Sequence, residues 1–155
     1  MSAARAALLC LALVAAACRD GEPPAAYTPG LGEIMTLNQM RHAKLWLAGE
    51  ARNWPLAAYE LDELQEGFSD AATFHPTHKG SPVSIAQSIA ALTSGPVSAL
   101  RTAIEAKDEA RFSAAFDALT DACNDCHRAA NFGFNVVTRP TASAFLNQDF
   151  APKAP

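Results

Sequence analysis

The sequence predicts an all-α protein, an up-down-up-down four-helix bundle followed by an irregular C-terminal tail. Half of the 155 residues are hydrophobic, but only 8% are aromatic. Alanine is abundant and runs of β-branched residues are few, a composition that favours helices over strands. Four stretches carry apolar residues at helical spacing and are joined by short links, which is the pattern of an antiparallel helix bundle. The length of the chain is that of a single domain.

The first helix is expected over residues 31–49. Met40 and Leu47 are predicted on its outer side, whereas Met35 and His42 lie one heptad apart on the core-facing stripe. That stripe consists of Leu31, Ile34, Met35, Asn38, His42, Leu45 and Trp46.

The second helix is expected to start at Asn53-Trp54-Pro55, with Asn53 as its cap and Pro55 in its first turn, and to continue to about residue 72. Its apolar stripe is Ala57, Leu61, Leu64, Phe68 and Ala71. Its other face carries the acids Asp62, Glu63, Glu66 and Asp70. The simplest interpretation of these acids is a solvated surface, and a docking patch for a basic redox partner is the alternative.

The third helix is expected to open at Pro82 and to be kinked or broken at Gly95-Pro96 before its apolar stripe resumes. The fourth is expected from Asp108, a plausible cap, to about residue 130. Residues 131–155 contain proline-led turns together with Phe132, Phe134, Phe145 and Phe150. So many large apolar side chains predict a tail that packs against the bundle.

One stretch carries recognisable chemistry: Cys123-Asn124-Asp125-Cys126-His127. It has the Cys-x-x-Cys-His form by which haem c is attached. The two thiols can add to the two vinyl groups of the porphyrin, and the adjacent imidazole can bind the iron as the proximal ligand. The cysteines also continue the core-facing helical stripe of Phe112, Phe116 and Leu119, so the motif faces the interior.

Two other interpretations of the motif are weaker. A structural zinc site needs two further ligands, and the sequence has no second Cys-x-x-Cys. A thioredoxin-type dithiol lies where a strand runs into the start of a helix, whereas Cys123 and Cys126 close a helical run.

The up-down topology places the end of the fourth helix beside the start of the first helix and the link between the second and third. The haem, His75, His78 and the C-terminal tail are therefore expected to cluster at one end of the bundle. His75 and His78 are interpreted as loop residues that hydrogen-bond to a haem propionate, with a role as the sixth iron ligand as the alternative.

The N-terminus reads as an export signal. Arg5 and the apolar stretch from Ala6 to Ala17 resemble a signal peptide over residues 1–17. The small residues before Cys18 resemble a bacterial lipoprotein signal, which implies lipid on the Cys18 sulfur; simple cleavage that leaves Cys18 free is the alternative. Residues 18–30, rich in proline and glycine, are then a tether. Cleavage removes one Arg and no acid, so the formal charge of the mature chain is 11 − 16 = −5.

A helical domain with Cys-x-x-Cys-His near the end of its fourth helix resembles the class II c-type cytochromes, the cytochrome c-prime class with its low-spin relatives. Arg41 to Trp46 and Ala58 to Leu61 are also similar to a group of small bacterial haem c proteins. The first resemblance covers residues 31–130 and implies that Cys123 and Cys126 form the thioethers to one haem c and that His127 is the proximal ligand. Relatives with an apolar distal residue bind small gases, and those with a methionine on the first helix carry electrons.

The distal ligand is expected to be His42, with Met35 as a close alternative. A buried imidazole beside the iron would otherwise require another polar partner. Met35, however, is nearer the expected haem end of the first helix.

The function expected from these features is single-electron transfer by a membrane-anchored lipoprotein of the bacterial periplasm. Its partner would be a redox protein of the cell envelope; homodimerisation is left open. The formal charge of −4 and the lack of a basic patch argue against nucleic-acid binding. Gas binding or sensing is the main alternative. A peroxidase-like activity that uses His42 is the weakest one, because no distal arginine stands at an identifiable spacing.

Overall fold

The computed structural model describes residues 27–153. The expected signal peptide (1–17), the expected lipidation site Cys18 and residues 18–26 of the expected tether lie outside the described residues.

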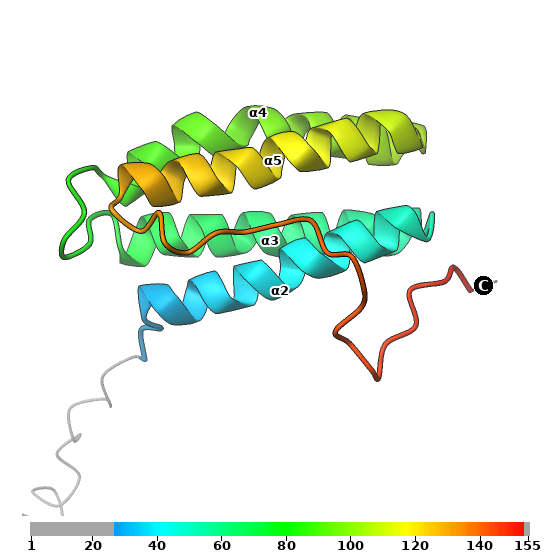
Figure 1. Cartoon of the computed structure of the whole chain (residues 1–155), viewed down its shortest axis with the longest axis horizontal. Helices are drawn as coiled ribbons and strands as arrows, with labels where there is room; N and C mark the ends of the chain where they lie inside the picture. Colours follow the sequence, from blue (N-terminus) through cyan, green and yellow to red (C-terminus); the bar gives the residue numbers. More distant parts are fainter. Residues whose placement is uncertain (1–26, 154–155) are drawn as a thin grey trace, which may run out of the picture.

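The described part of the chain forms four α-helices: α2 (Leu31–Glu50), α3 (Trp54–Phe74), α4 (Ile85–Ala106) and α5 (Glu109–Ala129). Figure 1 shows them lying side by side, with successive helices running in opposite directions. The predicted all-α four-helix bundle is thus confirmed. The α2–α3 and α4–α5 pairs pack extensively, whereas α2 and α5 meet over a short region only.

Two predicted helix caps are confirmed. The Asn53 side chain accepts a hydrogen bond from the Leu56 amide at 3.3 Å, and the Asp108 side chain accepts one from the Arg111 amide at 3.0 Å. Each satisfies an amide of the first helical turn that has no partner within the helix.

The start predicted for the third helix was wrong, and of the two alternatives predicted at Gly95-Pro96 the break was wrong. α4 begins at Ile85 rather than Pro82, because Ser84 caps it by accepting from the Gln87 amide at 3.3 Å. Gly95-Pro96 does not break α4, which continues through Pro96 as one helix. Proline inside a helix costs about 3 kcal/mol, but Ile89, Val97 and Leu100 are all buried around it. Packing on both sides therefore offsets the missing hydrogen bond.

The core follows the predicted stripes with one exception. Leu47 was predicted on the outer side of α2 but is only 9% exposed, and all of residues 45–49 are buried. The chain after α5 passes this part of α2, where the Lys44 ammonium lies 5.4 Å from the centre of the Phe145 ring. The chain after α5 therefore lies against this end of α2, where Phe145 packs on the core.

The chain after α5 is irregular and runs back along the bundle; we call residues 131–153 the strap (Figure 1). The Arg139 guanidinium pairs with Asp117 on α5 and lies 4.1 Å from the centre of the Trp46 ring on α2. Farther along, the Phe150 carbonyl accepts a hydrogen bond from the Asn53 side chain at 3.2 Å. The strap therefore ties α5 to α2 through Arg139 and reaches the N-terminal cap of α3 through Phe150. None of the helices between residues 27 and 153 has the length and hydropathy needed to cross a membrane.

Candidate functional site

A cavity of about 230 Å³ lies between the first half of α2 and the last two turns of α5. All three motif side chains, Cys123, Cys126 and His127, line it. The other walls come from every part of the fold: Met35, Asn38 and His42 of α2, Leu64 and Phe68 of α3, Ile85 and Ile89 of α4, His78 of the α3–α4 link, and Phe132, Asn135 and Val137 of the strap. The motif and both candidate distal residues therefore face one space.

The end of α5 sends the strap back past the motif. Asn131 adopts the left-handed conformation (φ 67°), which asparagine tolerates better than most residues. The Phe132 amide then donates to the His127 carbonyl at 2.7 Å, and the Asn131 amide donates to the Arg128 carbonyl at 3.2 Å. This is the hydrogen-bond pattern of a Schellman helix end. It reverses the chain, so that residues 135–137 return to the level of the motif.

The ring of His127 is oriented by that returning chain. Its Nδ1 lies 2.7 Å from the Asn135 carbonyl oxygen. A carbonyl can only accept, so the proton is on Nδ1 and the lone pair is on Nε2. Metal-binding histidines are held in this way, with the second ring nitrogen donating to a carbonyl or carboxylate. His127 is thus held in the tautomer that binds a metal through Nε2.

The two motif cysteines are free thiols in a partly buried setting. Burial raises the pKa of Cys123 to about 12 and also raises the pKa of Cys126. Catalytic dithiols require a lowered thiol pKa, so this setting is unsuited to thioredoxin-type exchange. Across residues 27–153, no three His, Cys, Asp or Glu side chains gather as metal ligands, which gives the zinc interpretation no further support.

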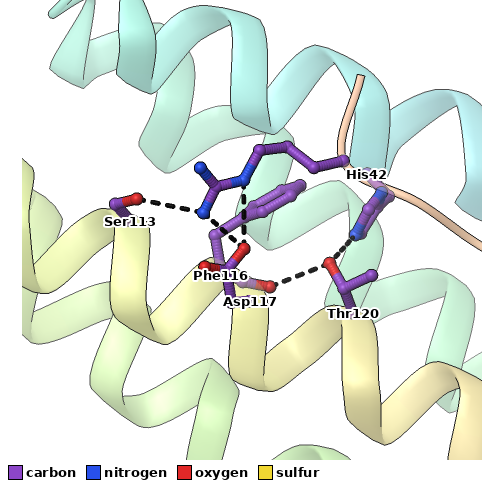
Figure 2. A network of polar contacts seen from close by, with 6 residues as sticks. His42, Ser113, Phe116, Asp117 and Thr120 are labelled. Atoms are coloured by element: carbon purple, nitrogen blue, oxygen red, sulfur yellow. Dashed lines mark hydrogen bonds and ion pairs between the residues drawn. The ribbon is translucent and has the colours of Figure 1, made fainter. Parts of the chain in front are cut away.

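His42 has a hydrogen-bond partner in the protein itself. Figure 2 shows its ring pointing from α2 toward Thr120 on α5, with Nε2 and Oγ1 2.9 Å apart. The Thr120 hydroxyl donates to the Phe116 carbonyl at 2.9 Å, so it accepts from His42 Nε2–H. Burial lowers the pKa of His42 to about 4, which leaves the ring neutral at pH 7. The reason for expecting His42 to bind iron was the lack of such a partner, and Thr120 removes it.

The His42–Thr120 pair also fixes the register of the antiparallel helices α2 and α5. Met35 precedes His42 by seven residues, and His127 follows Thr120 by seven. At 1.5 Å per residue, both lie about 10 Å from the pair in the same direction along the bundle. Met35, which is half-buried and lines the cavity, is therefore level with His127, whereas His42 is two turns away. Met40, predicted to face outward, is 36% exposed.

The two loop histidines do not act together. The His75 ring nitrogen Nε2 bonds to the Pro29 carbonyl at 2.8 Å, which ties the α3–α4 link to the chain before α2. His78 lines the cavity, and its ring centre is 5.6 Å from that of Phe132. Only His78 therefore lies where it could meet a haem propionate.

Asn38 brings an unpaired donor into the cavity wall. It is 4% exposed, and its Nδ2 has no hydrogen-bond partner within the described chain. Its Oδ1 accepts from Arg41 at 3.4 Å and rests against Gly67, where an added Cβ would lie 1.8 Å from that oxygen. A buried, unpaired amide costs about 1–3 kcal/mol, so a ligand with an acceptor atom at this point would relieve the cost.

No family model, curated protein or solved structure matches this chain.

The donor set of the cavity fits haem c: two thiols and one Nε2 on α5, a thioether level with that nitrogen on α2, and otherwise mostly apolar walls. The volume is below the roughly 300–1,000 Å³ of pockets that hold a cofactor. Binding a macrocycle therefore requires some of the walls to move outward.

Sequence reasoning missed four polar residues of this site. Thr120 is a lone hydroxyl in an apolar stripe, and that oddity was a usable signal. Asn38 was placed on the correct face but not recognised as a donor. Asn124 and Asn135 gave no signal, because their roles depend on the path of the strap.

Proposed function

We propose that this chain is a c-type cytochrome that carries one covalent haem and transfers single electrons in the bacterial cell envelope. The observation that carries the proposal is the hydrogen bond from His127 Nδ1 to the Asn135 carbonyl at 2.7 Å. It leaves Nε2 free in a cavity that both thiols of the Cys-x-x-Cys-His motif also line. That combination suits haem c better than zinc or a dithiol.

In this proposal Cys123 and Cys126 hold the haem through thioethers, His127 is the proximal ligand and Met35 is the distal one. We prefer Met35 to His42 because it is level with His127 and because His42 already bonds to Thr120. His78 is the residue placed to meet a propionate.

The bound haem would supply a one-electron iron couple. The bundle holds His127 and Met35, the two residues that would bind the iron, on packed helices, so little would need to rearrange when the charge on the iron changes. The mostly apolar walls would limit the access of water, and burial together with His127 and Met35 would set the potential. The exposed acids Glu66 and Asp70 of α3 are available to a basic redox partner, whereas Asp62 pairs with Arg101 at 2.8 Å.

The first test is covalent haem content after expression in a host that matures haem c. Wild type should retain haem on a denaturing gel and give the spectrum of a low-spin iron in both oxidation states, unchanged by carbon monoxide. The Cys123→Ala/Cys126→Ala double variant should lose covalent haem. A high-spin ferrous spectrum that shifts with carbon monoxide would replace electron transfer by gas binding.

Cys18→Ser is the matched cysteine control, and it also tests the location that we propose, a lipid anchor on the periplasmic side of a membrane. It should keep its haem but move from the membrane fraction to the soluble one. A wild type that is already soluble would contradict the anchor and leave the haem proposal intact.

A further inference from the structure

Asn124, the first residue between the two motif cysteines, makes two hydrogen bonds to the backbone of the strap, one from each end of its side-chain amide. Its Nδ2 donates to the Val137 carbonyl at 2.9 Å, and its Oδ1 accepts from the Val137 amide at 2.8 Å. Both contacts are partly buried. A paired donor and acceptor of this kind fixes the side chain and the backbone together, because neither group can rotate without losing both bonds.

The two Asn124–Val137 hydrogen bonds lie next to the bond that orients His127. Asn124 and His127 are three residues apart on α5 and so share one face of the helix. Val137 and Asn135 are two residues apart on the strap, and the Asn135 carbonyl accepts from His127 Nδ1. Beside the motif the strap is thus held to α5 at two points, by a pair of bonds at Asn124 and by a single bond at His127. Asn135 itself is exposed and contributes only a backbone carbonyl to His127.

A carbonyl that accepts from Nδ1–H makes the other ring nitrogen a stronger electron donor to a metal. A stronger proximal donor favours the ferric over the ferrous state and so lowers the reduction potential. Whatever keeps the Asn135 carbonyl in place therefore acts on the iron through His127.

We propose that Asn124 is a positioning residue that holds the strap so that His127 stays hydrogen-bonded and the reduction potential stays low. The inference rests on the proposed function. It assigns a role to a motif position that the haem-attachment pattern leaves free, and it makes the strap part of the proximal site.

The test compares Asn124→Leu with Asn124→Asp and a matched strap variant, Arg139→Gln. Leu makes neither bond to Val137, whereas Asp still accepts from the Val137 amide but cannot donate to its carbonyl. Arg139→Gln removes the ion pair to Asp117 and the contact with Trp46, and it leaves both Asn124 bonds in place.

The readouts are the reduction potential and the exchange of the His127 Nδ1 proton followed by NMR. At a fixed applied potential, Asn124→Leu should lower the ferric-to-ferrous ratio at least threefold, which corresponds to a rise of about 28 mV for one electron. Its Nδ1 proton should exchange faster. Asn124→Asp should fall between Leu and wild type, and Arg139→Gln should stay close to wild type in both readouts.

A haem-bearing Asn124→Leu protein with the potential and the proton exchange of wild type would overturn the inference while leaving the cytochrome proposal standing. An Arg139→Gln shift as large as that of Asn124→Leu would also overturn it, because the effect would then belong to strap stability in general. A wild type that takes up no covalent haem overturns both proposals.

Discussion

The two ends of the α2–α5 interface are built differently. At the end where α2 finishes and α5 begins, the rings of Trp46, Phe112 and Phe116 fill the space, with Trp46 and Phe116 5.0 Å apart and Phe112 and Phe116 6.2 Å apart. The approach there is so close that a Cβ added to Gly49 would lie 2.1 Å from the Phe112 ring. At the other end the same two helices enclose the cavity that Cys123 lines.

The His42–Thr120 hydrogen bond marks the boundary between these ends (Figure 2). At the aromatic end, the side chains fill the space between α2 and α5 by apolar packing. On the other side, Asn38 Nδ2 has no partner among residues 27–153, and the wall is completed by an irregular strap. The comparison indicates that the aromatic end is tightly packed and that the cavity end leaves space and one buried polar group without a partner in the described residues.

The largest expected effect is spectroscopic and belongs to the cavity end. Met35→Ala should convert a low-spin haem into a high-spin one that binds carbon monoxide, because it removes the side chain level with His127. His42→Ala should leave the iron low-spin, since His42 bonds to Thr120 two turns away. Visible spectra with and without carbon monoxide decide between them.

Met40→Ala is the control for that pair, because Met40 is on the outer side of the same helix. Its spectrum should match wild type. A high-spin iron in His42→Ala and a low-spin one in Met35→Ala would reverse our choice of ligand. If neither change alters the spin state, the sixth ligand is absent or comes from elsewhere, and His78 becomes the next candidate.

The second effect belongs to the aromatic end. Phe112 is 2% exposed and contacts the rings of Trp46, Trp54 and Phe116. Phe112→Ala should lower the free energy of unfolding by about 3–5 kcal/mol and leave the haem spectrum of the folded protein unchanged. Urea unfolding measures the loss, and Phe134→Ala, at a residue 83% exposed, is the control with an expected change within about 0.5 kcal/mol. A shifted spectrum in folded Phe112→Ala would mean that the two ends are not separable.

The sequence alone predicted the aromatic end well, for a physical reason. Apolar periodicity reports which side of a helix is buried, so Phe112, Phe116 and Trp46 were placed correctly. The caps at Asn53 and Asp108 were also predictable, whereas the Ser84 cap of α4 was not predicted. The break predicted as one alternative at Pro96 was wrong because packing along α4 overrides the local propensity of proline.

The cavity end was predictable only in part. The motif identified Cys123 and His127, and the topology placed them near the start of α2. The choice between Met35 and His42 depends on the hydrogen bond between His42 and Thr120. Predicting that bond requires the register of α2 against α5 to be known to within one helical turn. Periodicity fixes which face a residue occupies but not what lies opposite it, so Thr120 could not be paired with His42 in advance.

The third effect concerns the His42–Thr120 pair and is a dependence of the free energy of unfolding on pH. The pKa of His42 is about 4 in the folded protein and about 6.5 when the chain is unfolded. The unfolded chain therefore binds the proton first as the pH falls. The contribution of neutral His42 to stability is fully present above about pH 6.5 and is lost as the pH falls through 4, by up to about 3 kcal/mol.

His42→Gln removes this titration while keeping a group that can donate to Thr120. The free energy of unfolding should fall less steeply between pH 6.5 and 4 in His42→Gln than in wild type, as measured by urea unfolding at several pH values. Equal slopes would mean that His42 is accessible to protons in the folded state and that the boundary is not a dry one.

The smallest effect concerns the unpaired donor at the cavity end. Asn38→Leu replaces a buried amide with an apolar group of similar size. In the haem-free Cys123→Ala/Cys126→Ala protein it should be neutral or stabilise the fold by about 1 kcal/mol, since an unsatisfied donor disappears. In the haem-bearing protein the gain should vanish or reverse if the bound group offers Asn38 an acceptor.

Thr93→Val is the control, because Thr93 lines the same cavity but its hydroxyl already donates to the Ile89 carbonyl at 2.8 Å. The effect of Thr93→Val on the free energy of unfolding should be the same with and without haem. If the effect of Asn38→Leu is also the same in both forms, the unpaired amide has no part in holding the ligand.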